Sequence, residues 1–202
     1  MAYKKSEISA AQIVDAAMRV LARQGYARTS LLDIAREAGM SKGALHYHFP
    51  TKEALIQVVL EAACDRVQAR TLEAWSPADG AFVSLRRSLA TLWEVRAARS
   101  SEALVIADLL SLSLNDPALR PQLAKFYAHS AAQVQSYLEE QLLPLGLRPK
   151  VDLAVLPRLV IGLLDGLVMQ VFVDPAALTP TQVVTAVETL ALGLFEPQIG
   201  KR

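Results

Sequence analysis

Apolar residues recur at helical spacing through the first 50 residues and predict three short helices. The apolar positions of the first are Ile13, Ala17, Val20 and Leu21. Ser9 and Gln12 form a candidate capping box at its start, and Gly25 provides a stop signal at its end. The apolar positions of the second helix are Leu31, Ile34, Ala35 and Ala38. Thr29 and Ser30 are its candidate N-caps, and Gly39 ends it.

The third helix lies between Ser41, a candidate N-cap, and Pro50, which cannot continue a helix. Residues 38–41 read Ala-Gly-Met-Ser and join the second helix to the third. Two helices joined by a tight, glycine-containing turn are the pattern of a helix-turn-helix. A fourth helix is expected from Thr51 towards Trp75.

The remainder of the chain shows helical patterning without a competing strand pattern. Proline, asparagine and serine clusters near residues 76, 100, 116, 144 and 174 separate about five further helices. The composition agrees, since 52% of residues are hydrophobic but only 6% are aromatic. We therefore predict an all-α protein of about nine helices, with a helix-turn-helix domain at residues 1–50 and a larger helical domain at residues 51–202.

The net charge of +1 conceals an asymmetry along the chain. Residues 1–52 hold eight basic and four acidic side chains, whereas the rest hold 13 and 16. This difference indicates that the N-terminal part meets a polyanion.

The third helix has one packing face and one free face. On a helical wheel Leu45 and Phe49 fall on one side, and Gly43 and Tyr47 fall opposite them. The free face carries groups suited to a DNA major groove, including a lysine for phosphate, a methyl group for thymine and a histidine for base edges. The candidate DNA-binding residues are Thr29, Ser30, Ser41, Lys42, Gly43, Ala44, His46, Tyr47, His48 and Lys52.

Residues 29–55, TSLLDIAREAGMSKGALHYHFPTKEAL, resemble the DNA-binding signature of the tetracycline-repressor (TetR) family. The resemblance covers roughly residues 8–60. It implies a two-fold dimer, a helical effector domain and release from DNA when a small molecule binds. The family's DNA contacts map onto the candidate residues above apart from Ser41. One departure is His46, where many members have tyrosine or phenylalanine.

Other kinds of chemistry find little support. His46 and His48 point about 200° apart on a helix and lack a neighbouring cysteine, so no metal site is expected. No phosphate loop, nucleophile motif or carboxylate–histidine cluster can be assembled, so neither an enzyme nor a cofactor is predicted. Cys64 is interpreted as an inert core residue.

The segment from about Asp152 to Val173 is apolar nearly all round and requires a partner to cover it. It is interrupted by Asp165 and falls short of the roughly 20 apolar residues that span a bilayer, so a soluble dimer is expected rather than a membrane protein. The last helix offers a second apolar stripe. The predicted interface residues are Leu159, Gly162, Leu163, Gly166, Val183, Val187, Leu190 and Leu194.

An effector pocket is expected among the middle helices. Its candidate lining residues, each of which is also a good core residue, are Trp75, Trp93, Phe126, Tyr127, His129, Met169 and Phe172. Few charges fall nearby, which favours a mostly apolar or aromatic effector. The chain is thus interpreted as a cytoplasmic, homodimeric repressor that leaves a palindromic operator when its effector binds. The alternative is an architectural protein that coats DNA without ligand control.

Overall fold

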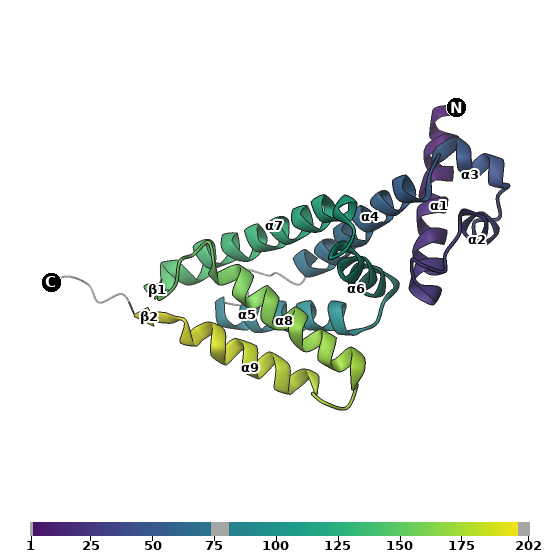
Figure 1. Cartoon of the computed structure of the whole chain (residues 1–202). Coiled ribbons are helices and arrows are strands. Elements are labelled where there is room, and N and C mark those ends of the chain that lie inside the picture. The colour runs from purple at the N-terminus through teal and green to yellow at the C-terminus, as the bar shows by residue number, and fades with distance from the viewer. Residues whose placement is uncertain (1, 74–80, 198–202) are drawn as a thin grey trace. The chain divides into compact units, whose positions relative to one another are not determined.

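The computed structural model (Figure 1) describes residues 2–73 and 81–197. Within these residues the chain forms nine α helices and two very short strands, as expected for an all-α protein. The helices are α1 Ala2–Gln24, α2 Leu31–Glu37, α3 Lys42–His48, α4 Lys52–Glu73, α5 Ala81–Ala97, α6 Ser101–Ser113, α7 Arg120–Tyr137, α8 Leu156–Val173 and α9 Pro180–Gly193. Shorter turns are η2 Pro117–Leu119, η3 Leu138–Leu142 and η4 Leu143–Leu145.

Two compact units make up the chain. The first contains Met1–Val67 and Arg99–Phe126, and the second contains Gln68–Ala98 and Tyr127–Arg202. The first unit is therefore larger than the predicted domain at residues 1–50. The reason is that α6 packs against α1, and the Asp108 carboxylate accepts a hydrogen bond from the Tyr26 N–H at 2.7 Å.

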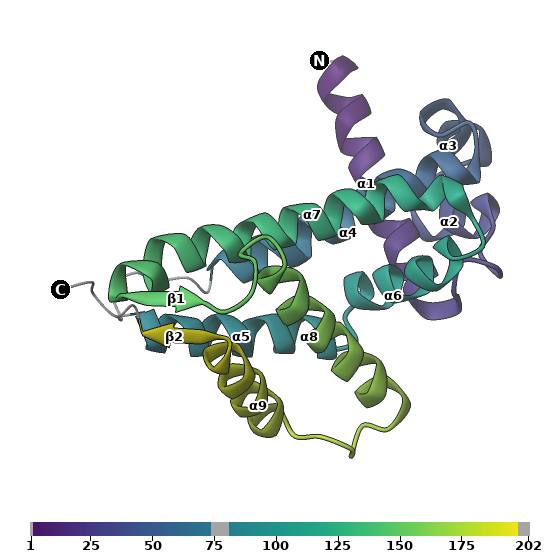
Figure 2. The same ribbon diagram turned by 60° about the vertical axis from the view of Figure 1, so that its left-hand side comes forward.

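In the first unit, α2 packs against both α1 and α3, and the two views in Figures 1 and 2 show it beside them. Its core is aliphatic, with Ile13, Val20, Ile34 and Leu45 all fully buried. Helix α1 begins at Ala2, so Ser9 lies inside it, and the expected start at Ser9 is wrong. Residues 2–8 contain no proline or glycine that would end the helix earlier.

In the second unit, α5, α8 and α9 pack against one another around a core that includes Trp93, Leu156 and Leu164. Strands β1 Leu147–Pro149 and β2 Phe195–Pro197 pair antiparallel, with Arg148 opposite Glu196. Sequence analysis missed this pair because three residues give no readable alternation, and their partners lie nearly 50 positions apart.

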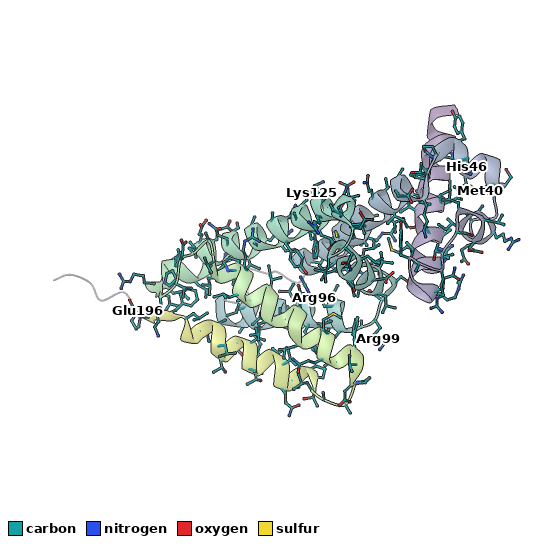
Figure 3. The ribbon with its side chains drawn as sticks, in the orientation of Figure 1. Met40, His46, Arg96, Arg99, Lys125 and Glu196 are labelled. Carbon is teal, nitrogen blue, oxygen red and sulfur yellow. The ribbon has the colours of Figure 1, made fainter. Side chains whose placement is uncertain are left out.

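A buried ion pair joins α5 to α8. The Arg96 Nε donates to the Asp165 carboxylate at 3.0 Å, and only 9% of the Arg96 side chain is exposed. Figure 3 labels Arg96 beside α8. Asp165, which interrupts the apolar run of α8, is therefore the counter-ion of a buried arginine.

Candidate nucleic-acid interface

Helix α2 begins with a complete capping box, for which Ser30 rather than Thr29 is the N-cap. The Ser30 Oγ accepts a hydrogen bond from the Asp33 N–H at 3.2 Å, and the Asp33 carboxylate accepts one from the Ser30 N–H at 3.0 Å. Hydrogen bonds from the side chain and backbone of Ser30 lower the pKa of Asp33. The cap therefore persists at neutral pH and is lost only on acidification.

The turn between α2 and α3 is closed by a Schellman motif. The N–H of Met40 donates to the carbonyl of Ala35 at 2.9 Å, and that of Gly39 donates to Arg36 at 3.1 Å. Gly39 has a φ of +67°, a conformation that side chains other than glycine adopt at a cost. This turn fixes where the chain enters α3.

Helix α3 is held by its buried face. The Ser41 Oγ caps it by accepting from the Ala44 N–H at 3.2 Å, and Leu45 is fully buried while Phe49 packs at its end. The opposite face is open: Tyr47 is 82% exposed. Lys42, Gly43, Ala44 and His46 are also exposed. Figure 3 labels His46 on this helix and Met40 in the turn before it. His48 is half-buried, with its ring edge-on to that of Tyr47.

Two of the ten candidate DNA-binding residues, Thr29 and Lys52, make contacts within the protein. Thr29 is 3% exposed, and its Oγ1 donates to the carbonyl of Gly25 at 2.7 Å. The Lys52 Nζ donates to the carbonyl of Tyr26 at 2.6 Å and lies 3.9 Å from the centre of the Tyr26 ring. Burial lowers the pKa of Lys52. Both side chains hold the turn between α1 and α2, and sequence spacing alone could not reveal these non-helical contacts.

Arginines of α1 also have partners within the unit. Arg19 and Arg23 both pair with Glu37 at the end of α2, at 2.9 and 3.3 Å. These hydrogen bonds lower the pKa of Glu37. Both arginines are exposed and Glu37 is half-buried, so we expect these two ion pairs to contribute little to the free energy of unfolding.

The exposed face of α3 carries a distinct set of chemical groups. A short helix with one buried leucine presents a lysine, a glycine, a methyl group, an imidazole and a phenol to solvent. A helix of this kind, placed after a tight turn, fits the major groove of DNA. The fold and the site define a helix-turn-helix DNA-binding protein.

The comparisons with known proteins identify the family. Residues 13–59 match the sequence model of the bacterial regulatory proteins of the tetR family, and residues 84–196 match that of the C-terminal part of BetI-type transcriptional repressors. The second match alone covers more than half of the chain. The chain belongs to the TetR family of transcription regulators, as its resemblance at residues 29–55 predicted.

Similarity to curated relatives is concentrated at the N-terminal end. The regulator TtgR of Pseudomonas putida is 41% identical over 59 residues, which is 29% of this chain and 28% of TtgR. YuxN of Bacillus subtilis is 35% identical over 82 residues, or 41% of this chain and 28% of YuxN. The chain thus matches less than a third of the length of each of these relatives.

Solved structures match along nearly the whole chain. A transcriptional regulator from Rhodococcus sp. Rha1 aligns with a TM-score of 0.77 at 22% identity, covering 95% of this chain and 99% of the other. A regulator from Saccharomonospora viridis, solved in complex with choline, aligns with a TM-score of 0.76 at 21% identity, covering 94% and 98%. These similarities show a shared fold.

The expected effector residues differ in burial and in the unit to which they belong. Trp75 lies outside the described residues. Phe126 belongs to the first unit, whereas Trp93 is buried in the core of the second. His129 and Met169 are exposed. Tyr127 and Phe172 are half-buried. None of the six described candidates is among the lining residues of the cavity found in the second unit.

The predicted dimer residues divide into two groups. Val183 and Val187 are 1% and 0% exposed and belong to the core of the second unit, so they are not available to a partner. Leu163 and Leu194 are half-buried against the same core. Leu159 and Leu190 are 48% and 56% exposed. Gly162 and Gly166 are exposed as well. The stripe on α9 was assigned to the partner because sequence patterning cannot tell an internal apolar face from an external one.

Lys42 and Lys52 should respond differently to substitution. We expect Lys42→Ala to lower the slope of log affinity against log salt by about one for each subunit, because an exposed lysine releases one counterion from DNA. Lys52→Ala should leave that slope unchanged and lower the free energy of unfolding by about 1 kcal/mol, because its hydrogen bond to Tyr26 is lost. Fluorescence anisotropy at several salt concentrations measures the first effect, and urea unfolding measures the second. A reduced slope in Lys52→Ala would show that Lys52 contacts DNA and would contradict this prediction.

Proposed function

We propose that the protein is a sequence-specific transcription repressor that reads a palindromic operator with α3. The observation that carries this proposal is the free face of α3, where Tyr47 stands 82% exposed while Leu45 on the other side is fully buried. Lys42 and the capped start of α3 suit phosphate, and Gly43, Ala44 and His46 suit base edges. Ser30, Ser41, Tyr47 and His48 complete the proposed contact surface. Residues 1–50 would read DNA, and residues 51–202 would sense and dimerise.

The second part of the proposal is a homodimer formed through α8. Its exposed apolar residues and glycines, together with Val155 just before the helix, follow a spacing of alternately four and three residues, which leaves one continuous apolar stripe. The stripe consists of Val155, Leu159, Gly162, Gly166, Met169 and Val173. A Cβ at Gly162 or Gly166 would meet no atom within 4 Å in its own subunit, so neither glycine serves packing within the subunit. Glycines on an exposed apolar stripe favour close approach of a second helix.

Helix α8 also meets the length and hydropathy criteria for a membrane span. Its 18 residues have a mean hydropathy of 1.7, and 33% of them are buried. The core of the second unit holds Leu156, Ile161, Leu164 and Val168 of this helix. We therefore assign α8 to a dimer core and the protein to the cytoplasm, where a DNA regulator works.

The third part is control by a small effector, which we propose to be mostly apolar or aromatic. Helix α4 is suited to transmit its binding, since Arg66 pairs with Asp15 of α1 and lies 3.8 Å from Glu102 of α6. A shift of α4 would strain these ion pairs and change the orientation of α1, α2 and the DNA-reading helix α3. The ligand would then favour a dimer whose heads no longer match successive major grooves.

Capture of genomic DNA fragments tests the proposed function. The purified protein is incubated with sheared genomic DNA at physiological salt and an excess of random competitor, and the retained fragments are sequenced. A sequence-specific regulator should retain a small set of fragments that share one palindromic element. Uniform retention of all fragments would favour the architectural alternative and contradict the proposal.

A further inference from the structure

A small cavity lies inside the second unit, among α5, α7, η3, α8, α9 and β2. Its volume is about 30 Å³, which is enough for a water molecule but not for a metabolite. The lining residues are Leu85, Ser88, Leu89, Leu92, Val134, Tyr137, Leu138, Leu142, Leu156, Val160, Ala191, Leu192 and Phe195. None of them belongs to the DNA-reading surface or to the exposed stripe of α8.

Ser88 is the feature that sets this cavity apart from a packing defect. Its side chain is buried to within 3% exposure, and its Oγ has no hydrogen-bond partner. Helical serine and threonine hydroxyls commonly donate to a carbonyl in the preceding turn. Ser113 and Thr189 do so in this protein, each at 2.7 Å. A buried hydroxyl that makes no such bond costs stability unless a ligand or water satisfies it.

The walls around Ser88 exclude a charged guest. Among the described lining residues there is no carboxylate, amine, guanidinium or imidazole. Burial raises the pKa of Tyr137 to about 12, so its phenol stays neutral under physiological conditions. The carboxylates of Asp165 and Glu188 on α8 and α9 already pair with Arg96 and Arg86. An ion entering this cavity would lose its hydration without gaining a counter-ion.

We propose that this cavity is the effector site, and that it takes an uncharged molecule with an aliphatic body and one hydroxyl or carbonyl group that bonds to the Ser88 Oγ. This inference rests on the proposed ligand control. A ligand of metabolite size must enlarge the cavity by displacing α5, α8 or α9 from one another. Helix α8 also carries the proposed dimer stripe, so a displacement of α8 would change the geometry of the proposed dimer.

The sequence contains one feature that could have indicated this site, a serine within an apolar helical face. Leu85, Ser88, Leu89 and Leu92 occupy the spacing i, i+3, i+4 and i+7, which is the buried face of an amphipathic helix. A serine in the middle of such a face stands where an aliphatic side chain is expected. Buried polar groups of this kind need a partner, and their presence points to a site.

Calorimetric titration of the purified protein, residues 1–202, tests the proposal with three probes of equal chain length: 1-hexanol, hexanoate and hexylammonium. We expect 1-hexanol to bind one site per subunit, and the two ions to bind at least tenfold more weakly because they bury an unpaired charge. Choline, the ligand of the structural neighbour from Saccharomonospora viridis, should not bind. Ser88→Ala should weaken 1-hexanol about fivefold, the equivalent of one hydrogen bond.

Two further variants serve as controls. Ser113→Ala removes a buried hydroxyl from α6 and should leave the affinity for 1-hexanol unchanged. Ala191→Phe places a ring in the cavity and should abolish binding. The proposal is overturned if 1-hexanol fails to bind, if the ions bind equally well, or if Ser88→Ala binds as tightly as the wild type. DNA affinity is measured on the same preparations. If the protein binds specific DNA but not 1-hexanol, only the proposal of an effector site in this cavity is contradicted. If the wild-type protein binds no specific DNA, the proposed function is contradicted.

Discussion

Gly166→Arg should convert the proposed dimer into monomers and reduce the affinity for a palindromic operator by about 100-fold or more, since the two copies of α3 then bind independently. Gly166 lies on the exposed stripe of α8, and a Cβ at this position meets no atom within 4 Å in its own subunit. The substitution therefore spares the subunit core. In a dimer that packs α8 against its symmetry mate, however, the arginine would meet the partner helix.

Light scattering at micromolar concentration gives the mass, and anisotropy with operator DNA gives the affinity. Ala132→Arg on the exposed side of α7 is the matched control, because it adds the same side chain to a helix outside the proposed interface. It should remain dimeric with wild-type affinity. A Gly166→Arg protein that stays dimeric would exclude the proposed α8 interface.

The double variant Lys42→Ala, Tyr47→Ala should lose about 100-fold in affinity for each half-site of the operator, because two contacts of roughly 1.4 kcal/mol each are removed from each subunit. Both side chains are exposed and neither supports the core. Alanine is also the best helix former, so the free energy of unfolding should stay within about 0.5 kcal/mol of the wild-type value. Loss of DNA binding without loss of stability would mark these residues as contacts.

Lys125→Ala is the charge-matched control for this variant. Lys125 also lies in the first unit, where it pairs with Glu61 at 2.6 Å, away from α3. Its removal changes the net charge by the same amount as removal of Lys42. The DNA affinity of Lys125→Ala should stay close to that of the wild type. Equal losses in the two proteins would reveal a general charge effect rather than reading by α3.

Local signals in the sequence predicted the boundaries of α2 and α3 and the buried face of α3. Ser30, Gly39 and Ser41 were expected at helix boundaries, and the structure places them there because each acts on backbone groups within a few residues. The buried face of α3 followed from the spacing of Leu45 and Phe49 in the same way. Such features depend on residues within one helical turn in the sequence, so they can be predicted without knowledge of the tertiary structure.

Features that depend on distant partners were missed. Lys52 is predicted to contact DNA because it follows the signature, and the spacing does not reveal that its ammonium group also donates to the Tyr26 carbonyl. Val183 and Val187 are predicted to lie in the dimer interface because their stripe is apolar. In the structure both are buried in the core of the second unit. The unsatisfied hydroxyl of Ser88 became visible only once the helices around it were placed. Periodicity gives the faces of a helix but not which neighbour covers each face.

The most direct test of the account is selection of bound sequences from a random DNA pool by the wild-type protein at a fixed salt concentration. A dimer that places two copies of α3 in successive major grooves should enrich a palindrome whose half-site centres lie one helical turn apart, about 34 to 36 Å, or a multiple of that distance. The double variant should enrich nothing under the same conditions. Failure of the soluble, dimeric wild-type protein to enrich any motif would contradict sequence-specific reading by α3.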